Sequence, residues 1–135
     1  MKLLKNLSIT CAAVSLLAGV CSAGESVELF NGKDLTGWTG SGYEVKDGAI
    51  VCTPKGKNLT SEKKYSNYVL NFEFKLPPGG NNGIGIHYTG TGNPANEGME
   101  IQVLDDTAPK YKDLKDYQFH GGIYFLKAAK KGHLK

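Results

Sequence analysis

Two segments of the sequence carry side chains suited to chemistry on polar molecules. In Met99–Leu104, Glu100 and Gln102 alternate with apolar residues, and His87 alternates in the same way in segment 82–88. Successive side chains of a strand point to opposite faces, so each alternation predicts one apolar and one polar face. Carboxylate and amide groups accept from and donate to hydroxyl groups. These faces therefore suit the recognition of a polyol such as a sugar.

Three further residues are expected near the same face. Asp105 follows segment 99–104, and His120 and Tyr124 share a face around Gly122, where residues 122–126 read as another strand. A carboxylate or an imidazole can transfer protons, and a phenol can hold a hydroxyl group or stack on a ring. Alternating polar residues are also typical of the solvent side of a sheet. The pattern does not choose between a catalytic face and a binding face.

Glycines interrupt these segments at Gly83, Gly85, Gly121 and Gly122. Glycine weakens a strand, so repeated glycine indicates that a backbone or a ligand approaches closely. On this interpretation the glycines leave room above the sheet beside the histidines. A bulge or a bend explains each glycine equally well.

The rest of the chain reads as short strands separated by turn residues. Asp47-Gly48 lies between two apolar segments and is a strong hairpin signal. In residues 68–76 every second position is apolar, and Asn71, Glu73 and Lys75 fall on the opposite face, which predicts a strand with one buried face. No long amphipathic helix is available to connect parallel strands. The sequence therefore predicts an all-β fold, an antiparallel sandwich or barrel.

Residues 1–23 have the pattern of an export signal. Lys2 and Lys5 precede an apolar run over 7–20, and small residues ending at Ala23 favour cleavage there. The run is shorter than the roughly 20 residues that span a bilayer comfortably. The pattern predicts a signal peptide at 1–23 and a periplasmic or extracellular domain at 24–135. A lipid anchor on Cys21 is the alternative.

Charge and composition argue against nucleic acid as a partner. The 135-residue chain contains no arginine, and loss of two lysines with the signal lowers its formal net charge from +3 to +1. Such a surface has no strong field to attract phosphates, and it lacks the bidentate guanidinium fork. Only Cys52 lies beyond the signal, so no internal disulfide is expected. No ligand spacing demands a metal, and no cofactor is expected.

Six phrases in order across residues 29–124 resemble the 3-keto-disaccharide hydrolase domain family. They are LFNGKDLTGW at 29–38, DGAIV at 47–51, NLTSEK at 58–63, NNGIGI at 81–86, GMEIQVLDD at 98–106 and YQFHGGIY at 117–124. The resemblance implies a concanavalin-like antiparallel β-sandwich (jelly roll) whose concave face holds the sugar. Relatives generally have Arg where His87 stands. The family pattern also continues beyond Lys135, so we expect the domain to be incomplete at the C-terminus.

The resemblance further implies cleavage of 3-keto-glycosides or 3-keto-disaccharides in the cell envelope, by hydrolysis that can proceed through elimination. On this interpretation Glu100 acts as base or acid, with His120 or Asp105 as its catalytic partner. The substrate would be positioned by three other residues, His87, Gln102 and Tyr124. Two alternatives remain open: a non-catalytic carbohydrate-binding module that uses the same face, and a surface adhesion domain that does not depend on it.

Overall fold

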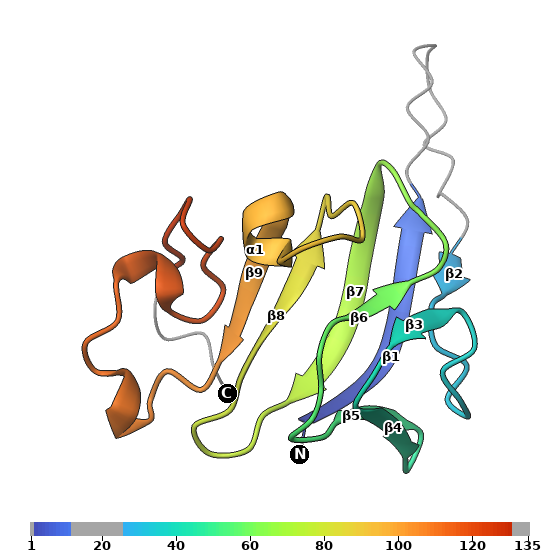
Figure 1. The fold of residues 1–135 in the computed structure, drawn as a ribbon, viewed down its shortest axis with the longest axis horizontal. Coiled ribbons are helices and arrows are strands. Elements are labelled where there is room, and N and C mark those ends of the chain that lie inside the picture. The colour runs from blue at the N-terminus through green and yellow to red at the C-terminus, as the bar shows by residue number, and fades with distance from the viewer. Residues whose placement is uncertain (1, 12–25, 131–135) are drawn as a thin grey trace, which may run out of the picture. The chain divides into compact units, whose positions relative to one another are not determined.

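The fold is built almost wholly from short antiparallel strands. The computed structural model describes residues 2–11 and 26–130, and places side chains for 26–130. The strands in these ranges are β1 Lys2–Cys11, β2 Ser26–Glu28, β3 Trp38–Gly40, β4 Tyr43–Lys46, β5 Ala49–Cys52, β6 Leu59–Ser61, β7 Tyr68–Lys75, β8 Asn81–Ile86 and β9 Met99–Leu104. Helical structure within them is limited to α1 (Pro94–Glu97) and the 3-10 turns Pro109–Tyr111 and Asp116–Gln118. The all-β prediction is confirmed (Figure 1), whereas a complete sandwich stays a prediction.

The chain divides into two compact units, residues 1–75 and 76–135. The first contains a five-stranded sheet in the order β2-β1-β5-β4, with β7 also paired to β1, and a two-stranded sheet of β3 and β6. The second contains the two-stranded sheet of β8 and β9. No described helix is long and apolar enough to cross a membrane.

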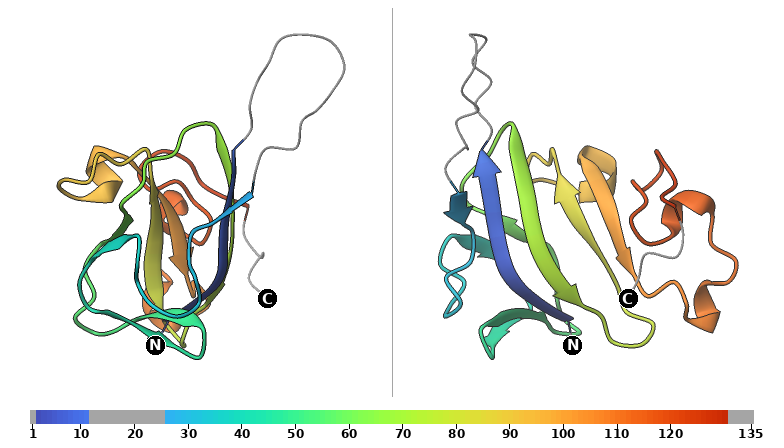
Figure 2. Two further views of the ribbon diagram at one scale, coloured as in Figure 1. Left: turned by 90° about the vertical axis from the view of Figure 1, so that its right-hand side faces the viewer. Right: turned by 180° about the vertical axis from the view of Figure 1, so that it is seen from behind.

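Strand β1 lies inside the first sheet rather than at its edge. It pairs with β7 over most of its length, while its residues 2–4 pair with β5 and its residues 8–10 pair with β2. Since several of the same β1 residues pair with β7 and with β5 or β2, these partners lie on opposite edges of β1 (Figure 2). Strand β1 falls within the segment expected to be an export signal. The expected cleavage after Ala23 and the alternative anchor at Cys21 lie outside the described residues.

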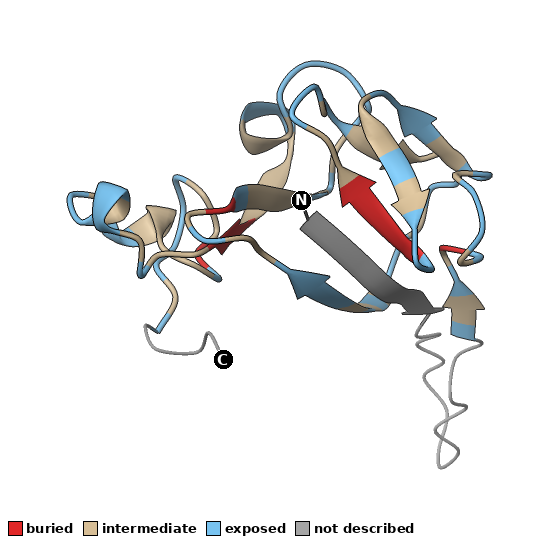
Figure 3. Cartoon of the chain, turned by 90° about the horizontal axis from the view of Figure 1, so that it is seen from below, coloured by how far each residue is buried: buried red, intermediate tan, exposed pale blue. Residues whose placement is uncertain are grey.

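The core of the first unit forms around β5. Ala49, Ile50 and Val51 are almost fully buried, and Ile50 packs in a cluster with Phe30 that includes Phe72 of β7. The buried residues are drawn in red in Figure 3. The predicted hairpin at Asp47-Gly48 is confirmed: Lys46 pairs with Ala49, and both turn residues have positive φ angles, 52° and 70°. This is the geometry that a tight two-residue hairpin needs.

Strands β8 and β9 pair along six residues in register. Ile84 lies opposite Ile101, while Gly83 lies opposite Gln102 and Gly85 opposite Glu100. The helix α1 connects the two strands and begins at an asparagine cap, with the Asn93 side chain accepting from the Ala95 amide at 2.9 Å. The two strands and the short helix together form the scaffold of the site described below.

The predicted strand at 122–126 is wrong. Ile123 forms isolated bridges to Ile101 and Lys127, and the residues between 123 and 127 form a turn. The amides of Leu126 and Lys127 both donate to the Ile123 carbonyl, at 2.9 Å each. The chain therefore reverses directly after Ile123, and the apparent alternation of apolar residues belongs to the turn.

Candidate functional site

One face of the β8–β9 pair presents the polar residues singled out above. Glu100 and Gln102 alternate along β9, and the register places Gly85 and Gly83 opposite them on the same face. The other face carries Ile84 and Ile101. Because a glycine has no side chain, β8 leaves space on this face that neighbouring side chains can fill.

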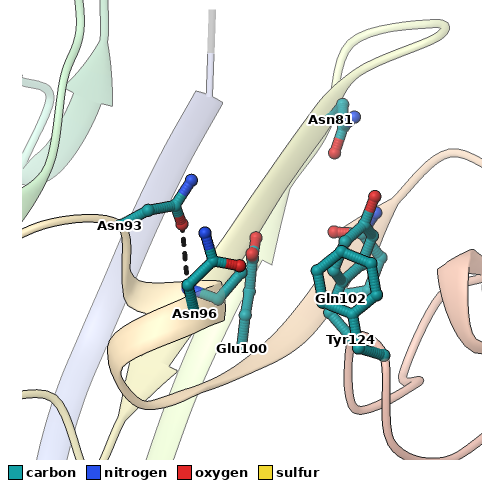
Figure 4. Close-up of a pocket in the computed structure, with 8 residues that line it drawn as sticks. Asn81, Asn93, Asn96, Glu100, Gln102 and Tyr124 are labelled. Carbon is teal, nitrogen blue, oxygen red and sulfur yellow. Dashed lines mark hydrogen bonds between the residues drawn. The ribbon is translucent and has the colours of Figure 1, made fainter.

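A pocket of about 360 Å³ opens on this face. It is lined by Asn81, Asn93, Ala95, Asn96, Glu100, Gln102, Tyr124 and Phe125. Its size is within the range of small-molecule sites. The lining includes four amide side chains, one carboxylate and one phenol (Figure 4), a set that can both donate to and accept from the hydroxyl groups of a sugar.

Glu100 is the carboxylate of this pocket. It is partly buried, and no described residue makes a hydrogen bond or an ion pair with its side chain that would favour the charged form. Burial raises the pKa of the Glu100 carboxyl above its ordinary value of 4.5, because removal from water disfavours the ionised form. A carboxyl of raised pKa is a stronger base when ionised and a more available acid when protonated.

Gly83 provides the space that the Glu100 side chain fills. A Cβ built on Gly83 would overlap the Cγ, Cδ and Oε1 atoms of Glu100. The carboxylate therefore lies over the neighbouring strand. The predicted close approach at this glycine is a side chain of the protein rather than open room for a ligand.

The other glycines are occupied too. A Cβ on Gly85 would lie 2.9 Å from the Pro94 Cβ, so the first turn of α1 packs on that glycine. A Cβ on Gly122 would lie 2.5 Å from the Tyr117 carbonyl oxygen. The contact at Gly85 holds α1 against β8, whereas the contact at Gly122 lies within the 117–122 segment. Two backbone hydrogen bonds hold that segment against β9: the Gln102 amide donates to the Gly122 carbonyl at 2.9 Å, and the Gly121 amide donates to the Gln102 carbonyl at 2.8 Å.

Hydrogen bonds fix the side of the pocket formed by Gln102 and Tyr124. Gln102 is 5% exposed, which corrects its expected place on a wetter face, and its Nε2 donates to the Gln118 carbonyl at 3.3 Å. The Gln118 Nε2 donates to the Tyr124 hydroxyl oxygen at 2.9 Å. Because that oxygen accepts from Gln118, the Tyr124 hydroxyl can still donate its own hydrogen into the pocket.

Asp105 lies at the end of β9, outside the pocket lining. Its carboxylate accepts from the Thr107 hydroxyl at 2.6 Å and from the Gly79 amide at 2.6 Å. The Thr107 hydrogen bond is the largest cause that lowers the pKa of the Asp105 carboxyl, followed by the Gly79 hydrogen bond. These bonds join the turn before β8 to the turn after β9.

The two predicted histidines also lie away from the pocket lining. His87 is exposed and follows the end of β8, and its φ angle of 52° breaks the alternation on which its expected position depended. The His120 Nδ1 accepts from the Leu104 amide at 3.2 Å, and the His120 amide donates to Asp106 at 3.2 Å. The structure thus brings together Glu100, Gln102 and Tyr124 of the six expected residues. The catalytic or binding roles of all six stay predictions.

Sequence reasoning missed the residues contributed by α1 and by the 123–127 turn. Asn93 and Asn96 come from the Asn-Pro segment that caps and forms α1, and Phe125 comes from the turn mistaken for a strand. Asn81 begins β8, and its amide points toward Gln102 and Tyr124 in Figure 4. No group of three or more His, Cys, Asp and Glu in the described part of the chain is placed to hold a metal ion.

Comparison with known proteins gives one result. No curated protein and no solved structure matches the chain. A family model described as the 3-keto-alpha-glucoside-1,2-lyase-like domain matches residues 25–134, most of the sequence and all of the pocket lining. The chain therefore belongs to the 3-keto-alpha-glucoside-1,2-lyase-like domain family.

Proposed function

We propose that this chain cleaves glycosides whose sugar ring is already oxidised to a ketone at carbon 3. The observation that carries the proposal is the Glu100 carboxyl, partly buried, of raised pKa, and facing a pocket of amides. The family description, which names a 3-keto-glucoside lyase, supports the same chemistry.

The reaction needs a base rather than a strong nucleophile. A ketone at carbon 3 acidifies the hydrogen on carbon 2, and Glu100 removes that proton. The electron pair of the C–H bond first forms an enolate and then the double bond between carbons 1 and 2. The bond from carbon 1 to the glycosidic oxygen breaks, and the leaving oxygen takes up a proton. Water can add to the double bond afterwards, which gives hydrolysis overall.

The remaining pocket residues can stabilise the charge that develops during this sequence. Donors aimed at the carbon 3 oxygen favour the enolate, and Asn96 and Gln102 supply amide N–H groups in the pocket. Tyr124 has a hydroxyl hydrogen to give to the leaving oxygen, because Gln118 donates to that hydroxyl. Asp105 is less suited to this step, since its lowered pKa keeps it ionised.

The proposal includes export of the chain. Residues 1–23 have the composition of a signal peptide, and a saccharide substrate is consistent with work in the periplasm or outside the cell. Sequencing the N-terminus of the protein recovered from each cell fraction tests this part. A start at Gly24 in the envelope or the medium supports it, and an intact Met1 in the cytoplasm contradicts it.

The activity is tested with a 3-keto-disaccharide and the same disaccharide unoxidised, each given to the full chain and to Glu100→Gln. We expect sugar release from the keto substrate only, lowered about 10²- to 10⁴-fold in the variant, the usual contribution of a general base. In deuterated water, deuterium should appear at carbon 2 of recovered substrate or product. Binding of the keto sugar without any release would instead support the non-catalytic binding module.

A further inference from the structure

An aromatic side chain at the pocket is exposed although it is held by its neighbours. Phe125 lines the pocket and is 58% exposed. Its ring contacts Tyr124, with ring centres 4.5 Å apart and planes at 73°, and Tyr117, with centres 5.5 Å apart. The ring is thus braced on one side by two tyrosines and open to solvent on the other.

The backbone at Phe125 is also unusual. Its φ angle is 64°, in the left-handed region that a bulky residue adopts only at a cost in free energy. Glycine would adopt the same turn more easily, yet an aromatic residue stands there. Strained residues of this kind concentrate at ligand-binding positions.

A backbone hydrogen bond places this turn beside the strand residue that carries the reacting carboxylate. The Tyr124 amide donates to the Glu100 carbonyl at 2.8 Å, so Phe125 follows the residue paired with Glu100. A sugar ring at Glu100 would therefore have its substituent within the same pocket as the Phe125 ring. The C–H groups on one face of a pyranose carry partial positive charge, which the negative face of an aromatic ring attracts.

We infer that Phe125 forms the platform for the second sugar ring of the substrate, the ring that leaves from carbon 1. This inference rests on the proposed function, in which the oxidised ring lies at Glu100. It assigns the site a preference for disaccharides over glycosides with a small leaving group. The polar residues around Glu100 hold the oxidised ring, and Phe125 holds the ring that departs.

The test compares the full chain with Phe125→Ala, Phe125→Tyr and Leu126→Ala. Leu126 is the matched control, because it is 66% exposed in the same turn but does not line the pocket. Two substrates are used, a 3-keto-disaccharide and the methyl glycoside of the same 3-keto sugar. Thermal unfolding of each variant shows whether it is folded.

We expect Phe125→Ala to raise KM for the disaccharide about three- to tenfold, the worth of one aromatic contact. Its KM for the methyl glycoside should be unchanged. Leu126→Ala should behave as the native chain does, whereas Phe125→Tyr, which keeps an aromatic ring, should recover most of the affinity for the disaccharide that Phe125→Ala loses. Equal effects of Phe125→Ala on both substrates, or no effect on either, would overturn the inference.

Calorimetric binding of the same two sugars separates this inference from the proposed reaction. Suppose that the native chain binds the disaccharide without cleaving it, and that Phe125→Ala weakens binding of the disaccharide but not of the methyl glycoside. The inference about Phe125 is then supported and the proposed catalysis is wrong. If turnover of both substrates is normal in every Phe125 variant, the proposed function stands and the platform fails. If the native chain binds neither sugar, both fail.

Discussion

The carboxyl group of Glu100 occupies the space that a side chain on Gly83 would fill. The two residues lie on neighbouring strands, and Gly83 is paired with Gln102 rather than with Glu100 itself. The Glu100 side chain therefore leans diagonally across the pair. Its position depends on the absence of a Cβ at Gly83, so this glycine helps to aim the carboxylate.

The substitution Gly83→Ala should displace Glu100 with little harm to the fold. Gly83 has no positive φ angle, and alanine is more favourable than glycine within a strand by roughly 0.5–1 kcal/mol. Release of sugar from a 3-keto-disaccharide should fall by about tenfold or more, because small misplacements of a catalytic group are costly.

A double variant separates this positioning role from a general effect on the strand. Glu100→Ala and Gly83→Ala combined should be no slower than Glu100→Ala alone, because the glycine acts through the carboxylate. A further loss of activity in the double variant would show that Gly83 acts independently of Glu100.

The substitution Glu100→Gln should raise thermal stability at neutral pH while it lowers activity. Burial raises the pKa of the Glu100 carboxyl, so the folded state binds this proton more tightly than the unfolded state does. The native stability conferred by that proton is complete below the ordinary pKa of 4.5 and is lost as the pH rises through the raised value. Glutamine does not titrate, so the gap in melting temperature between variant and native chain should narrow as the pH falls through the raised value toward 4.5, and should change no further below 4.5.

This prediction is checked by measuring the melting temperatures of both proteins between pH 3 and pH 8, in steps of about one pH unit. A gap that does not change with pH would mean that Glu100 titrates alike in the folded and unfolded chain. The folded structure would then not raise the pKa of the Glu100 carboxyl, and the argument that Glu100 is the catalytic base would lose its main support.

The sequence predicted strands well where one face packs on a core or a tight turn fixes the register. Alternation in β7 and the Asp-Gly hairpin between β4 and β5 both correspond to the structure. The pattern failed at 122–126, where local hydrogen bonds to Ile123 turn the chain and override the apolar alternation.

The site was predictable only where it lies on a strand. The alternation of side chains along a strand correctly predicted that Glu100 and Gln102 share a face. It did not predict the burial of Gln102, which depends on the 117–122 segment that covers it. Asn96 and Phe125 line the pocket only because α1 and the 123–127 turn pack against the β8–β9 pair. The turn meets β9 through residues more than 20 positions away in the sequence, and α1 is seated by the packing of Pro94 on Gly85; the alternation of side chains along a strand encodes neither contact.

The substitution Asp105→Asn should leave activity within about twofold of native, because Asp105 lies outside the pocket lining and holds a turn. Hydrogen bonds lower the pKa of the Asp105 carboxyl, so its ionised form stabilises the fold above the ordinary value of 3.8. That stability is lost as the pH falls through the lowered value. The melting temperature of Asp105→Asn should therefore be lower than that of the native chain at pH 7, and the two melting temperatures should converge as the solution becomes acidic.

The same comparison decides whether Asp105 belongs to the catalytic group. Glu100→Gln is the reference for a residue in the pocket, and sugar release from the keto substrate is the measurement. If Asp105→Asn is as slow as Glu100→Gln while still folded at pH 7, Asp105 takes part in proton transfer after all.

Removal of residues 1–23 should loosen the first unit, because the predicted signal and β1 overlap. Strand β1 is the partner of β7 among the described strands, and it also pairs with the buried strand β5. Without β1, backbone groups along both strands lose their hydrogen bonds and present sheet edges that favour aggregation. We expect amide hydrogens of β7 to exchange at least about tenfold faster in the chain 24–135 than in the full chain.

Hydrogen exchange followed by mass spectrometry on both proteins tests this expectation, with the amides of β8 and β9 as the internal control. Those strands pair with each other and not with β1, so their ladder should be protected alike in the two proteins. Equal protection of β7 in both proteins would mean that another segment takes the position of β1 once the leader is absent. In that case signal removal and a stable sheet are compatible, and β1 is replaceable in the mature protein.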